Sequence, residues 1–368
     1  MSCGNASSGR ALRVAVLAPI SWRVPPVHYG PWEQFASLLS EGLVARGMDV
    51  TLFATKSSIT RARLIGSAPR GYSEDEALDA KAWECLQISS VFERAREFDI
   101  IHNGFDFLPL SYSSLVSTPV VTTIHGFSSE RILPVYQKYD RSTHYVAISD
   151  ADRHSALQYA ATIHHGIDMA SFRLGRGPRK YLLFFGRIHP HKGTREAIEI
   201  AKMAGLPLVI AGIVQDGDYF RREVEPHIDG WQVRFIGAVA ARKKSALLGG
   251  ARALLHYVSF DEPFGFSVVE AMACGTPVVA TPRGAMPELI RDARVHTPAD
   301  ARANGWLVRS LAEAADAAGD VGKLNPAEVR ESVERRFDAM RMVDDYIALY
   351  RQILASKDGA DVNVARSI

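Results

Sequence analysis

The sequence predicts two doubly wound α/β domains, each built on a parallel sheet. Two observations carry this prediction. Short apolar runs of strand length alternate with helical segments from residue 14 onward, and the same alternation restarts at residue 181. Between the two series lies a stretch rich in glycine and charge, 166–180, which is typical of a linker. We therefore expect an N-terminal domain over 1–170 and a C-terminal domain over 178–339. The length of 368 residues also favours two domains.

The elements follow from apolar runs and their flanking turn residues. In the first series we predict strands at 14–19, 48–55, 98–102, 119–125 and 144–149, and a helix between Pro31 and Gly47. In the second series we predict strands at 181–186, 207–212, 233–237, 252–258 and 277–282, helices at 193–204 and 267–274, and one last long helix at about 327–356. The polar stretch 56–79 has no clear periodicity, and Ser149 is expected to cap a helix that follows it.

Composition limits the class of protein. The formal net charge of +2 gives no argument for a nucleic-acid partner. The three cysteines are scattered without metal-ligand spacing, which fits a reducing cytoplasm. We see no signal peptide and no apolar run of about 20 residues, so we expect a cytoplasmic protein, with peripheral membrane contact left open. The basic cluster 242–244 is interpreted as a solvated helix face.

Two glutamates stand out in the segment DEPFGFSVVEAMACGTPVVATP, 261–282. Ser267 and Glu270 have the spacing of a capping box, so Glu270 is either a helix cap or a ligand for a bound molecule. Glu262 has no helix to cap and lies in a loop with Gly265. A helix N-terminus offers amides to phosphate, and a carboxylate accepts hydrogen bonds from sugar hydroxyls. Together these features indicate a nucleotide-sugar site.

A second candidate segment is GRIHPHKG, 186–193, which follows a predicted strand. Arg187 and Lys192 are two cations in one strand-to-helix loop, placed to neutralise a diphosphate unless they are ordinary surface charges. His125 ends another predicted strand. Asp216 and Asp218 form a D-x-D triplet that is either a metal site or a solvated turn, and we favour the turn.

These segments resemble the retaining glycosyltransferases of family 4. The stretch 262–280 resembles their E-x7-E region, 186–193 their G-R-…-K-G segment, and 284–290 their G-x-x-E-[LIV] segment, in the family's order. The resemblance covers about residues 12–355. It implies the GT-B fold, in which two Rossmann-like domains face a cleft and a C-terminal helix, here about 340–357, rejoins the first domain. One departure is Tyr29-Gly30-Pro31, where many members have paired glycines.

The resemblance also implies roles for residues. The catalytic residues would be His125, Glu262, Arg187 and Lys192. The donor would be bound by Arg187, Lys192, Glu262, Phe264, Gly265, Phe266, Glu270 and Gly30. In this assignment Glu270 binds the ribose hydroxyls, Arg187 and Lys192 bind the diphosphate, and Glu288 supports the loop before it. No metal ion and no other cofactor is expected, because the nucleotide-sugar is a co-substrate.

The expected reaction is transfer of a sugar from a nucleoside-diphosphate sugar, a UDP-sugar foremost, to an acceptor hydroxyl with retention of the anomeric configuration. The acceptor is expected to be a small molecule or saccharide. Trp22, Tyr29 and Trp32 either stack on it or pack in the core. The alternatives are a nucleotide-sugar epimerase or hydrolase of the same fold and a non-catalytic sugar-binding protein. A nicotinamide dehydrogenase is disfavoured because the G-x-G-x-x-G fingerprint is missing after the first strand.

Overall fold

The chain forms two compact units, each an α/β domain. The structure is a computed structural model that describes residues 10–27, 30–126, 130–295 and 303–365, with side chains up to Lys357. Within these residues, unit 1 covers the chain up to Ala147, His154–Ala161 and the part from Val343 onward, and unit 2 covers Ile148–Arg153 and Thr162–Met342. Residues 148–153 and 162–170 thus lie in unit 2, not in the first domain as their position in the sequence suggests.

Unit 1 is built on a sheet with the strand order β3-β2-β1-β4-β5-β6-β7. Its central strands are parallel, with Val14 opposite both Val50 and Ile100. The strands are β1 Arg13–Leu17, β2 Asp49–Ala54, β3 Arg63–Gly66, β4 Ile100–Asn103, β5 Val120–Ile124, β6 His144–Ala147 and β7 Tyr159–Thr162. Central strands of this sheet are continuous apolar runs because both faces are covered.

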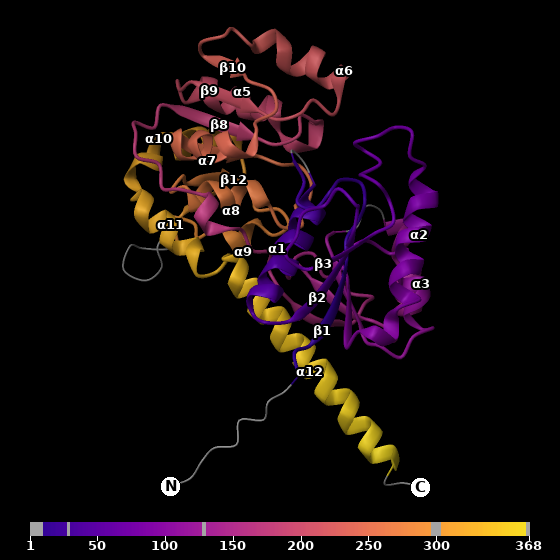
Figure 1. Ribbon diagram of the computed structural model, residues 1–368. Helices are drawn as coiled ribbons and strands as arrows, with labels where there is room; N and C mark the ends of the chain where they lie inside the picture. The colour runs from indigo at the N-terminus through magenta and orange to yellow at the C-terminus, as the bar shows by residue number, and fades with distance from the viewer. Residues whose placement is uncertain (1–9, 28–29, 127–129, 296–302, 366–368) are drawn as a thin grey trace, which may run out of the picture. The chain divides into compact units, whose positions relative to one another are not determined.

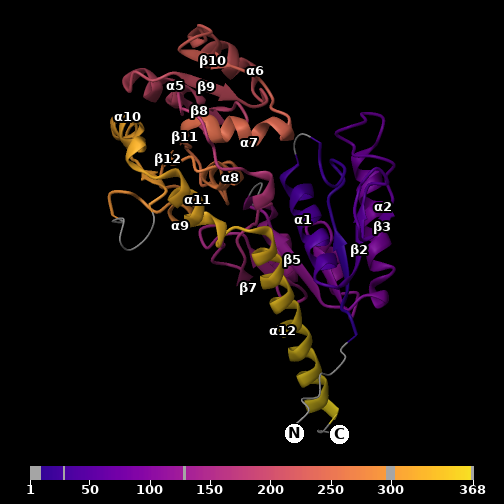
Figure 2. The ribbon, with the colours of Figure 1, turned by 60° about the vertical axis from the view of Figure 1, so that its left-hand side comes forward.

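Helices cover both faces of this sheet. α1 (Pro31–Ala45) and α2 (Ala80–Phe92) lie on opposite faces (Figures 1 and 2). On the α2 side, Ile88 and Val91 pack on Leu17 and Ile101 of the sheet. The other helices of unit 1 are α3 Leu110–Ser113, α4 Leu133–Tyr139 and most of α12, Ala339–Ala365.

Unit 2 has the strand order β10-β9-β8-β11-β12-β13, which is the doubly wound order 3-2-1-4-5-6. Its pairs are parallel, as in the register of Leu183 with Val209 and Leu254. The strands are β8 Tyr181–Phe185, β9 Leu208–Ala211, β10 Val233–Phe235, β11 Ala251–His256, β12 Val278–Ala280 and β13 Gly305–Leu307. The sequence therefore predicted the fold class of both units correctly.

Two apolar clusters fill the two faces of the unit 2 sheet. One contains residues of α8 and α11, such as Val268 and Val329, and the other contains residues of α5 and α10, such as Ile198 and Ala314. The helices of this unit are α5 Thr194–Met203, α6 Gly217–Tyr219, α7 Ala241–Gly250, α8 Phe266–Ala273, α9 Met286–Leu289, α10 Leu311–Asp320 and α11 Pro326–Glu334. No helix in the described part of the chain is long and apolar enough to cross a membrane.

The strand order places a topological switch point in each sheet. In unit 2 the chain leaves β8 toward one face and β11 toward the other, so the loops after these two neighbouring strands diverge at the carboxyl edge. Open α/β sheets bind ligands at such a point. The loop after β8 carries Arg187 and Lys192, and the loop after β11 carries Glu262.

Some elements differ from the sequence-based prediction. The stretch 56–79 contains the short edge strand β3. The predicted helix at 327–356 is two helices, α11 and α12, because Ile167 pairs with the chain at Asp338 and its amide bonds to the Phe337 carbonyl. The predicted linker 166–180 is partly buried, since Met169 and Phe172 belong to the unit 2 core. Ser149 caps a turn, donating to the Pro263 carbonyl and accepting from the Asp152 amide.

Candidate functional site

The loop between β8 and α5 presents two cations. Lys192 ends a short 3-10 turn, and Gly193 then caps α5 in the left-handed conformation with φ of 76°. A Cβ on Gly193 would lie 1.9 Å from the Tyr257 carbonyl oxygen, so only glycine lets this loop approach the segment after β11 so closely. The approach brings Lys192 to the neighbouring loop that carries Glu262.

Lys192 and Glu262 form a partly buried ion pair. The Lys192 Nζ lies 2.5 Å from Glu262 Oε2, and the two side chains are 16% and 14% exposed. The ammonium also lies 4.5 Å from the centre of the Phe260 ring. An aromatic face and a carboxylate both attract an ammonium group, so these two contacts hold the Lys192 side chain in place.

The carboxyl group of Glu262 is strongly acidic. Burial raises its pKa, but the contacts with His256 and Lys192 have a larger opposite effect and lower the pKa to about 2. His256 Nε2 lies 3.6 Å from the same oxygen that Lys192 contacts, Glu262 Oε2. At neutral pH Glu262 is therefore a carboxylate, which accepts hydrogen bonds and donates none.

The backbone of Glu262 is held by the segment 284–290. The Ala285 amide donates to the Glu262 carbonyl at 2.9 Å. Gly284 has φ of 54°, and a Cβ there would lie 2.3 Å from the same carbonyl oxygen. The glycine of the G-x-x-E segment thus fixes the Glu262 loop by close backbone contact.

The resemblance implied that Glu288 supports the loop before it, but in the structure its side chain contacts residues 150, 151 and 164 instead. Its carboxylate accepts from the amides of Asp150 and Ala151, at 3.0 and 2.8 Å, and pairs with His164 at 2.7 Å. Burial raises the pKa of Glu288, but the His164 contact and the two amides together lower it more, so the pKa lies below its usual range. Glu288 is thus a structural carboxylate inside unit 2 that organises 150–151. 

Glu270 is not a helix cap. α8 begins at Phe266 with Gly265 as its N-cap, in the left-handed conformation and without a side-chain cap bond, so the capping-box interpretation is wrong. Glu270 lies in the helix, is 7% exposed, and accepts from Lys244 Nζ at 2.6 Å. Lys244 comes from the first turns of α7, so this member of the basic cluster does not belong to a solvated helix face.

Phe264 and Phe266 turn their rings into the protein. Phe264 is 2% exposed, and Phe266 stacks on His165 with ring centres 4.9 Å apart. Gly265 between them has φ of 98°, and a Cβ would meet Met286. The rings therefore anchor the start of α8, and what this segment offers a ligand is the first backbone amides of the helix, which have no acceptor within it.

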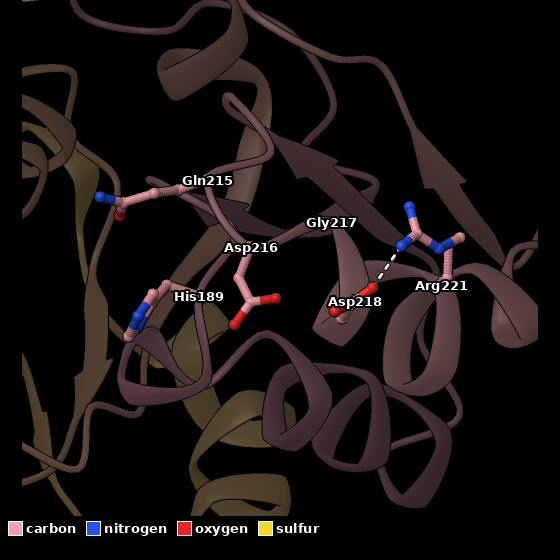
Figure 3. Close-up of a pocket in the computed structure, with 6 residues that line it drawn as sticks. All are labelled: His189, Gln215, Asp216, Gly217, Asp218 and Arg221. Atoms are coloured by element: carbon pink, nitrogen blue, oxygen red, sulfur yellow. Dashed lines mark hydrogen bonds and ion pairs between the residues drawn. The ribbon is translucent and has the colours of Figure 1, made fainter.

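A polar pocket of about 380 Å³ in unit 2 is lined by Gln215, Asp216, Asp218 and Arg221 among others (Figure 3). Arg187 Nη1 donates to Gln215, one of its lining residues, at 2.7 Å. Asp216 accepts from the Tyr219 amide and so caps α6, while Asp218 pairs with Arg221. The remaining lining residues are His189 and Gly217. The described residues contain no group of three or more His, Cys, Asp or Glu side chains that could hold a metal ion. The D-x-D triplet forms the start of the short helix α6.

In unit 1, His125 follows β5 within a cluster of aromatic rings. Trp32 stacks on it with ring centres 5.4 Å apart, and Phe35 meets it edge-on at 4.8 Å. Burial lowers the pKa of His125 to about 3, although a hydrogen bond with the Gly104 backbone opposes this. His125 is therefore a neutral imidazole at physiological pH, and Trp32 has His125 as its stacking partner.

Gly30 and the Trp22 backbone both lie next to Glu33 at the start of α1, in unit 1. Gly30 is the N-cap with φ of 146°, and a Cβ there would lie 2.7 Å from Glu33 Oε2. Glu33 is 3% exposed and accepts from the Trp22 amide at 3.1 Å. Burial raises the pKa of Glu33 to about 7. Tyr29 lies outside the described residues, so the structure says nothing of it.

The structure brings part of the predicted site together. Lys192 and Glu262 are in contact, and Glu270 is buried on the helix that follows Glu262. Sequence reasoning missed Lys244 and His256, the partners of the two glutamates. The arrangement consists of two carboxylates, each paired with a lysine, and Arg187 comes from the same loop as Lys192 but contacts Gln215. It can neutralise a polyanion and accept hydrogen bonds from hydroxyls.

Comparison with protein families matches both units. The model for glycosyl transferases group 1 matches residues 170–325, and the model for glycosyltransferase family 4 matches 33–171. A phosphatidyl-myo-inositol mannosyltransferase of Mycobacterium leprae is 27% identical over 398 residues, which is 96% of this chain and all of that protein.

Solved structures show the same fold. A glycosyltransferase involved in avilamycin A biosynthesis gives a TM-score of 0.67 at 24% identity, covering 94% of this chain and 98% of that one. The Anabaena protein HepE in complex with UDP-glucose gives 0.66 at 18% identity, covering 94% and 100%. At these identities the likeness establishes the fold, and it confirms the two-domain architecture that the sequence predicted.

Proposed function

We propose that this chain, which belongs to the family 4 type of GT-B glycosyltransferases, moves a sugar from a nucleoside-diphosphate sugar to an acceptor hydroxyl with retention of configuration. The observation that carries the proposal is the Lys192–Glu262 pair at the switch point of unit 2, with Nζ and Oε2 2.5 Å apart. A cation for the diphosphate and a carboxylate for the sugar are held side by side on neighbouring loops. Such a pair matches the two chemically different halves of a nucleotide-sugar.

The proposed roles in unit 2 follow from charge and burial. Arg187 and Lys192 bind the diphosphate, together with the first amides of α8 around Gly265 and Phe266. Glu262 accepts hydrogen bonds from sugar hydroxyls, and its low pKa supports this because the group stays ionised at neutral pH. Glu270 binds the ribose hydroxyls, with Lys244 holding its carboxylate in place.

The proposed reaction needs no metal ion. The bond between the anomeric carbon and the diphosphate breaks, and the acceptor oxygen bonds to that carbon on the same face. The acceptor proton passes to the departing phosphate oxygen. Arg187 and Lys192 stabilise the charge that grows on the diphosphate, a preorganised electrostatic effect in which one donor is worth about 3 kcal/mol, or about 100-fold in rate.

For the donor we propose a UDP-sugar. This choice is suggested by HepE, a protein of the same fold whose structure holds UDP-glucose.

For the acceptor we propose a hydroxyl-bearing saccharide or polyol bound by unit 1. The name of the Mycobacterium leprae relative, a phosphatidyl-myo-inositol mannosyltransferase, gives an inositol ring on a lipid as one acceptor to try. In unit 1 the candidates are the neutral His125, the ring of Trp32 that stacks on it, and the ring of Trp22, because aromatic side chains can stack on a sugar ring.

The test is product analysis with and without acceptors. Purified protein is incubated with UDP-, GDP- and ADP-sugars in EDTA, alone and with inositol, monosaccharides and phosphatidylinositol vesicles, and the products are resolved by mass spectrometry and NMR. Acceptor-dependent release of the nucleoside diphosphate with an axial-to-axial or equatorial-to-equatorial product supports the proposal. Conversion of the sugar without acceptor indicates an epimerase or hydrolase. Tight binding without turnover in every mixture indicates a sugar-binding protein and overturns the proposal.

A further inference from the structure

The side chain of His256 faces the carboxylate of Glu262 at a distance longer than an ordinary hydrogen bond. It is the last residue of β11, 6% exposed, and its Nε2 has no hydrogen-bond partner in the described structure. This nitrogen lies 3.6 Å from Glu262 Oε2. This separation is about 0.7 Å longer than an ordinary N–H···O hydrogen bond.

A buried nitrogen without a partner is unfavourable, typically by 1–3 kcal/mol. Such atoms are rare in native proteins, and a role in binding or catalysis is one reason to keep them. The carboxylate of Glu262 is only an acceptor, so the nitrogen that faces it carries the proton. His256 is thus a hydrogen-bond donor aimed at Glu262 and held just out of reach.

Lys192 occupies the position that His256 would take. Both side chains address the same oxygen, Glu262 Oε2, at 2.5 and 3.6 Å. Lys192 reaches it from the loop after β8, on a flexible stem that can swing toward a phosphate. His256 reaches it from a strand, where the backbone is fixed by the parallel register with β12.

A bound diphosphate competes with Glu262 for Lys192. A phosphate oxygen offers the ammonium a second anion, so the contact between Lys192 and Glu262 weakens when the donor arrives. Glu262, with 14% of its side chain exposed, then needs a new donor to remain ionised and oriented. The imidazole of His256 lies beside it and needs the acceptor that the lysine releases.

We propose that His256 is a positioning residue for the donor sugar: it takes over Glu262 Oε2 from Lys192 when the diphosphate binds. The inference rests on the proposed function, since it assumes that Lys192 binds the diphosphate and Glu262 the sugar. The inference goes beyond that function because it gives His256 a role in sugar recognition. Lys192 moves from Glu262 to the diphosphate, and His256 replaces it at Glu262. The nucleoside diphosphate alone does not need His256, but the attached sugar does.

The test compares two affinities in each variant. Titration calorimetry measures the dissociation constants of UDP and UDP-glucose, or of GDP and GDP-mannose where the wild type prefers guanosine. The variants are His256→Leu, which removes the donor, His256→Gln, which keeps an N–H at similar reach, and His144→Leu, a control at a half-buried histidine in unit 1. Melting temperatures are recorded for all of them.

The expected result is a split between the two ligands. His256→Leu weakens nucleotide-sugar binding about tenfold, the effect of one hydrogen bond to a charged group, while nucleoside-diphosphate binding changes less than twofold. His256→Gln restores most of the loss, and His144→Leu leaves the ratio of the two constants unchanged. A purely structural role for His256 would lower the melting temperature and weaken both ligands together.

Two outcomes overturn different statements. If His256→Leu keeps the wild-type ratio of the two constants, or if His256→Gln is as poor as His256→Leu, the exchange is refuted while the proposed function stands. If the wild type binds neither nucleoside diphosphate nor any nucleotide-sugar, the proposed function itself fails. If His256→Leu does not fold, His256→Asn serves in its place, because the shorter amide keeps polarity but cannot reach Glu262.

Discussion

Lys192 and Glu262 meet with Nζ and Oε2 2.5 Å apart, although 70 positions of sequence separate them. The contact exists because the strand order of unit 2 makes β8 and β11 neighbours and so brings the ends of their loops together. Each side chain is mostly buried, so neither is a free surface charge.

Replacing Lys192 by alanine is expected to lower the transfer rate by about 100-fold, because the diphosphate loses a positioned cation. Steady-state kinetics with the preferred nucleotide-sugar measure the effect. Lys180→Ala removes an exposed lysine of the same unit and serves as the control. A rate within threefold of wild type for Lys192→Ala would remove Lys192 from the donor site.

Protonation of Glu262 is expected to be one cause of the loss of stability of the wild type at low pH. Its folded pKa of about 2 lies below the unfolded value near 4.5, so its stabilising contribution is complete above pH 4.5 and is lost as the pH falls toward 2. The contribution amounts to roughly 3 kcal/mol. Urea denaturation at pH 7, 5, 4 and 3 measures it, and Glu262→Gln should flatten the curve between pH 5 and 3. A curve for Glu262→Gln as steep as that of the wild type would contradict the low pKa.

Glu33 is expected to have the opposite pH dependence. Burial raises its folded pKa to about 7, so its protonated form is favoured in the folded state and ionisation destabilises the protein as the pH rises from 4.5 toward 7 and above. Glu33→Gln keeps an acceptor for the Trp22 amide and removes the ionisation. We expect the free energy of unfolding of the variant to exceed that of the wild type by up to about 3 kcal/mol at pH 8 and to differ little at pH 4. Equal free energies of unfolding at pH 8 would show that Glu33 ionises freely.

Lys244→Ala is expected to destabilise unit 2 by about 1 kcal/mol, because it leaves the buried carboxylate of Glu270 without its cation. The neighbouring Lys243→Ala is the matched control, since Lys243 lies exposed on the same helix. Chemical denaturation measures both variants. The pair has no stabilising role if the two variants unfold at the same denaturant concentration. 

The sequence predicted the fold because the central strands are apolar runs that alternate with helices. It missed β3, whose residues Arg63–Gly66 are all partly or fully exposed and carry no apolar run. It predicted one helix where α11 and α12 are separate, because the break depends on pairing with Ile167, far away in the sequence. Local patterns do not contain contacts of this kind.

The motifs predicted the two glutamates and Arg187 as site residues, but the sequence did not reveal which side chains contact the glutamates. Glu262 and Glu270 stand out because their segment resembles a family, and the same is true of Arg187. Lys244 looked like one charge in a basic run, and its contact with Glu270 exists only once α7 and α8 pack together. His256 is one histidine in an apolar strand, and no spacing rule connects it with Glu262.

The most direct test of the central claim is a thermal-shift titration with UDP, GDP, ADP and dTDP in EDTA, on the wild type and Glu270→Ala. A ligand at 100 times its dissociation constant stabilises a protein by about 2.7 kcal/mol. The account predicts that one nucleotide stabilises the wild type by an amount of this size without metal, and that Glu270→Ala loses most of the shift. If no nucleotide shifts the wild type, or if Glu270→Ala responds as the wild type does, unit 2 does not bind a nucleotide donor in the way proposed.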